Sequence, residues 1–107
     1  MLHYALDYND LVLEFKKKVI IEETPIMLAL LADKVYAIQD KCTHLGGSLS
    51  KGAIENTEVK CRLHGAKFDL KTGNVIEKAH VGFVKMPTKK AKIFRTEVLD
   101  GKIFVEL

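Results

Sequence analysis

The chain has 107 residues, 48% hydrophobic and 29% charged, which is typical of one globular domain and not of a disordered chain. Its net charge of +3 comes from scattered basic residues, so nothing indicates a nucleic-acid-binding protein. No apolar stretch could span a bilayer and no secretory leader opens the chain, so we expect a cytoplasmic protein with no membrane contact. No repeat or linker divides residues 1–107, which predicts a single domain.

The N-terminal part reads as short strands with one irregular segment. The segment 8–15 begins with Asn and Asp after Tyr8 and predicts a turn or a short helical turn. Alternation and β-branched residues predict strands elsewhere. These strands are His3–Asp7, Lys17–Glu22, Pro25–Leu31 and Lys34–Ile38.

A second group of strands follows the middle of the chain. Glu58–Cys61 predicts a short strand, and Lys67–Leu70 is expected to pair with 75–76 across a turn. Gly73 lies in that turn and supplies the positive φ that such turns often need.

The C-terminal part carries the clearest hairpin signal. Ile93–Leu99 and Lys102–Glu106 flank the dipeptide Asp100-Gly101, which is a strong two-residue hairpin turn. Many short strands with regular turns predict an all-β fold, an antiparallel sandwich or barrel.

Two mixed pairs of metal-ligating residues stand out from this background. Cys42 and His44 are separated by one residue, Cys61 and His64 by two, and sixteen residues lie between the pairs. Thiolate and imidazole suit zinc or an iron–sulfur cluster, whereas ions that prefer oxygen would need carboxylates. Zinc sites more often pair like ligands, which favours the iron–sulfur alternative. A disulfide is less expected, since nothing indicates secretion.

Glycines follow both pairs. Gly46 and Gly47 come after the first pair and Gly65 after the second. Glycine lets a backbone N–H approach a metal-bound sulfur closely, so we predict that some of these amides donate hydrogen bonds to cluster or cysteine sulfur.

The pattern resembles the Rieske family. The sequence reads C-T-H-L-G-G-S-L-S-K-G and then V-K-C-R-L-H-G-A-K-F-D-L-K-T-G, and the match covers residues 35–75 strongly. The resemblance implies a β-sandwich with a small cluster-binding subdomain, at about residues 40–76, formed by two loops. It also implies one [2Fe–2S] cluster per chain, with Cys42 and Cys61 on one iron and His44 and His64 on the other.

Departures from the family pattern bear on the redox potential. Respiratory Rieske proteins have two further Cys and place hydroxyl donors near the second His, but here Ala66 and Phe68 stand at those positions. Fewer donors stabilise the reduced cluster less, which predicts a potential at the low end of roughly −150 to +300 mV. The family's proline-containing loop is reduced to Pro87, late in the segment 77–90. His80 in this segment is interpreted as an ordinary surface residue, with a role at a partner interface as the less favoured alternative.

The resemblance implies an electron carrier, a Rieske-type ferredoxin that takes an electron from a reductase and passes it to a terminal oxygenase, with no catalysis of its own. The alternatives are the small subunit of a nitrite reductase-like enzyme and a zinc-binding structural module. The lysine runs at residues 16–18 and 89–92 indicate a solvated face or a docking patch for an acidic redox partner. The sequence does not indicate the oligomeric state.

Overall fold

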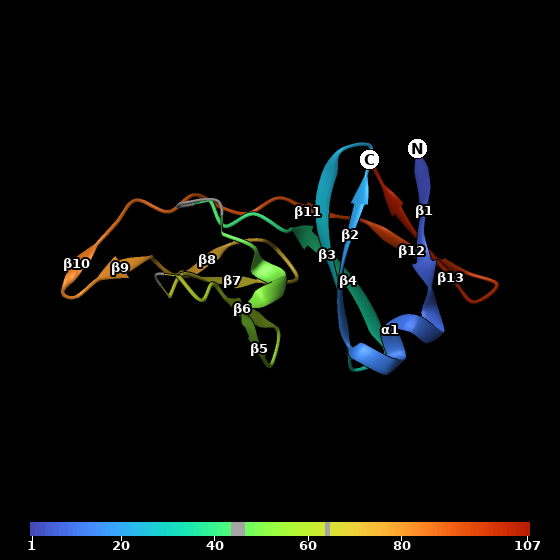
Figure 1. Cartoon of the computed structure of the whole chain (residues 1–107), viewed down its shortest axis with the longest axis horizontal. Coiled ribbons are helices and arrows are strands. Elements are labelled where there is room, and N and C mark those ends of the chain that lie inside the picture. Colours follow the sequence, from blue (N-terminus) through green and yellow to red (C-terminus); the bar gives the residue numbers. More distant parts are fainter. Residues whose placement is uncertain (44–46, 64) are drawn as a thin grey trace.

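The computed structural model describes residues 1–43, 47–63 and 65–107. Its strands form four antiparallel sheets, which confirms the all-β expectation (Figure 1). The elements are β1 (Leu2–Asp7), α1 (Tyr8–Glu14), β2 (Lys16–Ile21), β3 (Thr24–Leu31), β4 (Lys34–Gln39), the 3₁₀ turn η1 (Leu49–Lys51), β5 (Ala53–Glu55), β6 (Glu58–Lys60), β7 (Lys67–Asp69), β8 (Val75–Glu77), β9 (His80–Val81), β10 (Val84–Lys85), β11 (Ile93–Phe94), β12 (Thr96–Leu99) and β13 (Lys102–Glu106).

The inner strands β3 and β4 of the sheet β11-β4-β3-β2 are covered on both faces. Along β3, Ile26 and Leu28 face one core while Met27 and Ala29 face the other, and all four are fully buried. A strand covered on both faces needs apolar residues at every position, so β3 is a nearly continuous apolar run.

The two cores have different partners. The base core lies between the central sheet, α1 and the sheet β1-β13-β12, and its buried members are Leu6, Leu11, Ile21, Ile26, Leu28, Leu30, Ala37, Ile103 and Val105. The cysteine core lies between the central sheet and the sheet β5-β6-β7-β8, and its buried members are Met27, Ala29, Ile38, Cys42, Leu49, Val59, Cys61, Ala66, Phe68, Leu70, Ala79 and Ala91. The molecule is therefore elongated, measuring 48 × 26 × 19 Å, with the cysteines away from the base.

The irregular N-terminal segment is a seven-residue helix, somewhat more than the predicted turn. Leu11 is its one buried residue and anchors it in the base core. The helix ends at Phe15, whose φ of 63° is left-handed and whose N–H donates to the Leu11 carbonyl over 2.7 Å.

Three predicted hairpins are present, namely β3–β4, β7–β8 and β12–β13. One predicted strand is wrong: Ile93–Leu99 is divided at Arg95, because β11 pairs with β4 in the central sheet and β12 pairs with β13 in the base sheet. The strands β5, β9 and β10 were not predicted.

A buried carboxylate fixes the end of β4. Asp40 is 1% exposed, and its side chain accepts hydrogen bonds from the Ser48 hydroxyl (2.5 Å) and the Ser50 amide (2.7 Å). The ammonium group of Lys18 on β2 lies 3.5 Å from the same carboxylate. Asp40 thus ties the central sheet to the polypeptide that returns from the first cysteine-bearing loop.

Replacing Gly73 with Ala should destabilise the fold more than replacing Gly101 with Ala. Both glycines have positive φ, +80° and +74°, which costs an L-residue about 1–2 kcal/mol. A Cβ on Gly73 would also lie 2.0 Å from the Ala91 carbonyl oxygen, whereas one on Gly101 would meet nothing within 4 Å. Thermal unfolding followed by circular dichroism measures both variants, and equal losses would contradict the backbone contact.

Replacing Asp40 with Ala should lower the free energy of unfolding by about 2–4 kcal/mol, because it leaves the part-buried Ser50 amide without its acceptor, removes one partner of the Ser48 hydroxyl and breaks the ion pair with Lys18. Asp69→Ala is the matched control, since that carboxylate accepts the Lys71 amide in an exposed turn and should cost under about 1 kcal/mol. Guanidinium unfolding of the purified protein measures both. A loss for Asp40→Ala no larger than the control's would show that the buried network contributes little.

Candidate metal centre

The first cysteine lies in a loop closed by backbone hydrogen bonds. The Leu49 amide donates to the Asp40 carbonyl (2.7 Å), Lys41 pairs with Ser48 in an isolated bridge, and the Cys42 amide donates to the Gly47 carbonyl (2.6 Å). Cys42 therefore lies at the start of a closed loop that follows β4.

The second cysteine is held in the same way. The Cys61 amide donates to the Ala66 carbonyl over 2.7 Å, again five residues further along the chain. The Gly65 amide donates to the Cys61 carbonyl over 3.1 Å, and Gly65 has a φ of +74°. That amide therefore donates inside the loop, and its predicted hydrogen bond to cluster sulfur stays a prediction.

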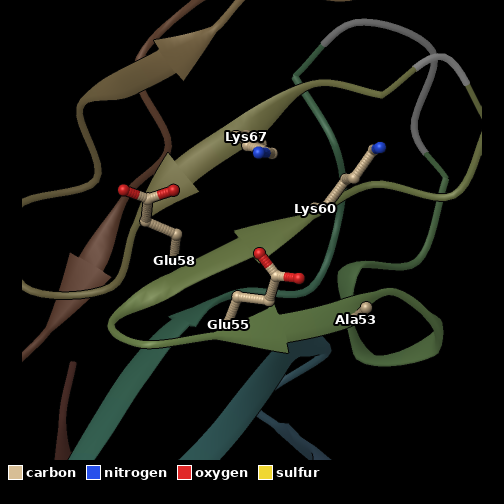
Figure 2. A pocket seen from close by; sticks show the side chains of 5 residues that line it. All are labelled: Ala53, Glu55, Glu58, Lys60 and Lys67. Carbon is tan, nitrogen blue, oxygen red and sulfur yellow. The ribbon is translucent and has the colours of Figure 1, made fainter.

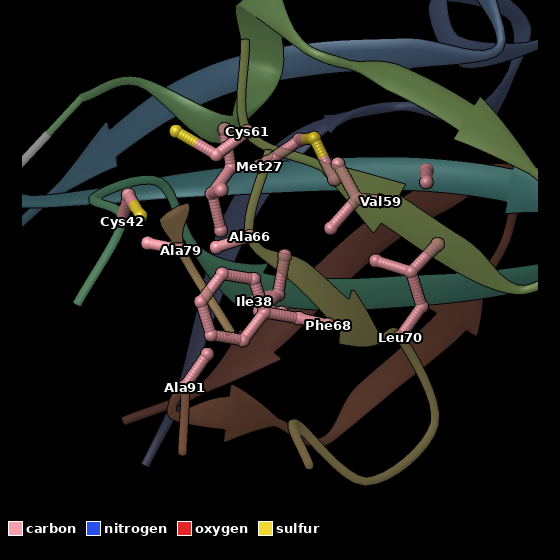
Figure 3. Packing of buried hydrophobic residues seen from close by; sticks show 12 residues of the cluster. Met27, Ile38, Cys42, Val59, Cys61, Ala66, Phe68, Leu70, Ala79 and Ala91 are labelled. Atoms are coloured by element: carbon pink, nitrogen blue, oxygen red, sulfur yellow. The ribbon is translucent and has the colours of Figure 1, made fainter. Parts of the chain in front are cut away.

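The two loops pack directly against each other. A Cβ built on Gly47 would lie 2.6 Å from Leu63 Cδ1 and 3.5 Å from Cys61 Sγ, so only glycine lets the first loop pass this close to the second. Cys42 and Cys61 are 4% and 2% exposed and are not joined in a disulfide. Figure 3 shows both thiols at one end of the cysteine core.

Both predicted histidine ligands, His44 and His64, lie outside the described residues, as does Gly46. The loops that contain the two histidines are the ones closed by the Cys42 and Cys61 amides. Among residues 1–43, 47–63 and 65–107, no group of three His, Cys, Asp or Glu is placed to hold a metal ion.

Residues 78–92, here called the return segment, lie against both loops. The Thr43 hydroxyl donates to the Lys89 carbonyl over 2.6 Å. On the other side, a Cβ on Gly65 would lie 2.9 Å from His80 Cε1, so the imidazole of this exposed residue packs over the second loop. Sequence reasoning missed Thr43 and did not predict the packing of His80 on Gly65, because neither contact has a local signal and one of them joins residues 46 positions apart.

Ala66 and Phe68 are completely buried. The carbonyl of Ala66 closes the Cys61 loop, and in Figure 3 its methyl group lies between the phenyl ring of Phe68 and the thiol of Cys61. Neither side chain can donate a hydrogen bond, so this side of the cysteine pair is lined by hydrocarbon.

The exposed face of β5–β7 carries a shallow hollow of about 100 Å³, lined by Ala53, Glu55, Glu58, Lys60 and Lys67 (Figure 2). In the strand register Glu55 lies opposite Glu58, and Lys60 lies opposite Lys67. Two carboxylates and two ammonium groups on a solvated sheet face include no nucleophile, so this hollow resembles an ordinary charged surface.

The buried thiol pair is thus the feature with distinctive chemistry. Two thiolates on facing loops suit zinc or an iron–sulfur cluster, as the residue types predicted.

Within the described ranges, no helix is long and apolar enough to cross a membrane.

Solved structures of other proteins have a similar fold. A structure similar over the whole chain is the ferredoxin of carbazole 1,9a-dioxygenase from Nocardioides aromaticivorans IC177, with a TM-score of 0.82, 21% identity, and coverage of 98% of this chain and 96% of that one. A mutant of NdmA from Pseudomonas putida CBB5 has a TM-score of 0.80 and 22% identity over 98% of this chain, which spans about a third of the NdmA chain (33%). At these identities the two structures show a shared fold.

The sequence relationship is more specific. The ferredoxin component of biphenyl 2,3-dioxygenase from Rhodococcus jostii (strain RHA1) is 36% identical over 75 residues, which cover 70% of this chain and 68% of that protein. The model of the Rieske [2Fe–2S] domain matches residues 3–88, which include both cysteine-bearing loops and most of the return segment. The chain therefore belongs to the Rieske [2Fe–2S] domain family.

Proposed function

We propose that this chain is a one-electron carrier that holds one [2Fe–2S] cluster through Cys42, His44, Cys61 and His64. The observation that carries the proposal is the matched closure of the two loops, which brings both buried thiols to one end of one core. The residues fit the group: the thiols are soft donors not joined to each other, and Gly47 leaves the space beside Cys61 Sγ free of a side chain.

The chain's own residues would hold and shield the group. When bound, such a cluster accepts and returns one electron. Cys42 and Cys61 would supply its two thiolates from within the apolar core, and buried Ala66 and Phe68 would keep water and hydroxyl donors from that side. The two histidines would complete the ligand set, one from each loop.

The partners follow from the relatives. The protein from Rhodococcus jostii is named as the ferredoxin component of a dioxygenase. We infer that this chain likewise takes an electron from a reductase and delivers it to a terminal oxygenase. It would serve that system as a carrier without substrate chemistry of its own.

Replacing Cys42 or Cys61 with Ser should abolish cluster assembly, because an alcohol is a far poorer ligand for iron than a thiolate. His44→Ala and His64→Ala should also lose most of the cluster, whereas His3→Ala, at the base of the molecule, should retain it. Iron and acid-labile sulfide per chain, with the visible spectrum, measure the result. Wild-type iron and sulfide in either cysteine variant would refute the ligand assignment, and zinc without iron in the parent would favour a structural zinc module.

Replacing Ala66 with Ser should raise the reduction potential from the low end of the range of Rieske centres. One new hydrogen bond to sulfur is worth about 1 kcal/mol, or roughly 40 mV for one electron. Ala91→Ser is the matched control, because Ala91 is equally buried in the cysteine core but lies across the Phe68 ring from the thiols in Figure 3. Spectroelectrochemical titration measures both, and equal shifts would contradict a local donor effect.

A further inference from the structure

The strands β9 and β10 form a ribbon that pairs with no other strand of the described chain. A lone two-stranded ribbon is marginally stable in water, so its position depends on its root. There the Met86 amide donates to the Ala79 carbonyl (2.8 Å), and the Ala79 amide donates to the Thr88 hydroxyl oxygen (3.0 Å). Ala79 is fully buried in the cysteine core, which anchors the ribbon in the same core as the two thiols.

The tip of the ribbon is apolar and exposed. Phe83 is 106% exposed, more than in an extended reference peptide, and Val81 and Val84 are 53% and 67% exposed. Beside them is an open hollow of about 290 Å³ lined by Glu77, Lys78, His80, Gly82, Phe83 and Lys85. Exposed aromatic side chains that can be buried by a partner contribute strongly to protein interfaces.

The charge around this tip is mostly positive, with Glu77 as the acidic residue that lines the hollow. The return segment contains five Lys and no Asp or Glu, namely Lys78, Lys85, Lys89, Lys90 and Lys92. Residues 40–92 carry 11 Lys and Arg against 5 Asp and Glu, a net +6, whereas the remaining residues carry 6 against 9, a net −3. The chain is thus polarised, with its positive end at the cysteine loops (Figure 1).

We propose that the β9–β10 ribbon is the docking element for a redox partner protein whose contact face is acidic around an apolar hollow that receives Phe83. The lysines would steer the partner, and Phe83 would fix its orientation. The hydrogen bond of Thr43 to Lys89 holds the return segment against the first loop, and His80 of the ribbon packs on Gly65 of the second. A partner docked on the ribbon would therefore lie near the cysteine-bearing loops. This proposal rests on the proposed electron-carrier function.

The fixed position of the ribbon favours a protein over a membrane as the occupant. A lipid surface needs apolar and basic residues but no set distance to the cysteine loops. Electron exchange does need a set distance, and the anchors of the return segment provide it. Buried Ala79 holds its N-terminal end. At its C-terminal end Ala91 donates its amide to the Gly73 carbonyl (2.9 Å), and Lys92 donates its amide to the Gln39 side chain (2.7 Å).

The test measures electron transfer from the dithionite-reduced holoprotein to a defined acidic acceptor, the haem of cytochrome b5, by stopped flow. One electron leaves the reduced protein and converts ferric to ferrous haem. We expect the second-order rate constant to fall as ionic strength rises. The triple variant Lys85→Glu/Lys89→Glu/Lys90→Glu should lower it at least about tenfold at low salt, and Phe83→Ala should lower it several-fold at all salt concentrations.

Matched variants at the base of the molecule provide the controls. Leu13→Ala removes an apolar side chain that is 80% exposed on α1, and Lys34→Glu/Lys102→Glu reverses two exposed lysines there, so neither should alter the rate beyond the small effect of net charge. Neutral 1,4-benzoquinone should oxidise all variants at the same rate. Iron content of each variant shows whether its cluster is intact.

The outcomes separate the two proposals. A parent protein with no reducible cluster would refute the electron-carrier function. A reducible parent whose rate with cytochrome b5 is the same in the ribbon and base variants would refute the docking element alone. Binding of the oxidised protein to phosphatidylserine vesicles that is lost in Phe83→Ala would reassign the ribbon to a membrane. A change of oligomeric state in that variant, seen by sedimentation, would reassign it to self-association.

Discussion

Each cysteine-bearing loop is closed by a hydrogen bond from the cysteine amide to the carbonyl five residues later, and the arrangement of the site depends on this pair of closures. They place each cysteine at the first position of its loop, and both cysteines are buried in one core. The absence of a side chain at Gly47 then lets the loops touch. Two cysteines held this way are preorganised to bind one shared metal group.

The rest of the fold supplies a rigid platform for those loops. The inner strands β3 and β4 of the central sheet are covered on both faces, so a single layer of strands packs against both the base core and the cysteine core. Asp40 at the end of β4 extends this rigidity into the first loop, since its carboxylate binds the returning backbone at Ser50. The base thus contributes stability, and the far end carries the two cysteines. The two parts also differ in net charge, since residues 40–92 carry +6 and the remaining residues −3.

Local signals in the sequence were sufficient for the features that depend on neighbouring residues. The pairing of β12 with β13 follows from Asp100-Gly101, whose φ angles of 52° and 74° are both positive as that turn requires. The division of Ile93–Leu99 into β11 and β12 could not be predicted from local signals. Residues of high β propensity lie on both sides of Arg95, and only tertiary packing decides which sheet each side joins. The β9–β10 ribbon was missed for a related reason: its four paired residues are too few to show alternation, and its anchors, such as Thr43 with Lys89, join distant parts of the chain. The motif predicted two cysteines that the structure buries in one core, and the assignment of Cys42, His44, Cys61 and His64 as ligands stays a prediction.

The most direct test of the central claim is the electron paramagnetic resonance spectrum of the dithionite-reduced protein, recorded with iron and sulfide quantified in the same sample. We predict two iron and two sulfide per chain and a rhombic signal, with an average g value below that of [2Fe–2S] proteins ligated by four cysteines, because two imidazoles would replace two thiolates. A signal typical of all-cysteine ligation, or zinc in place of iron with no signal, would contradict it.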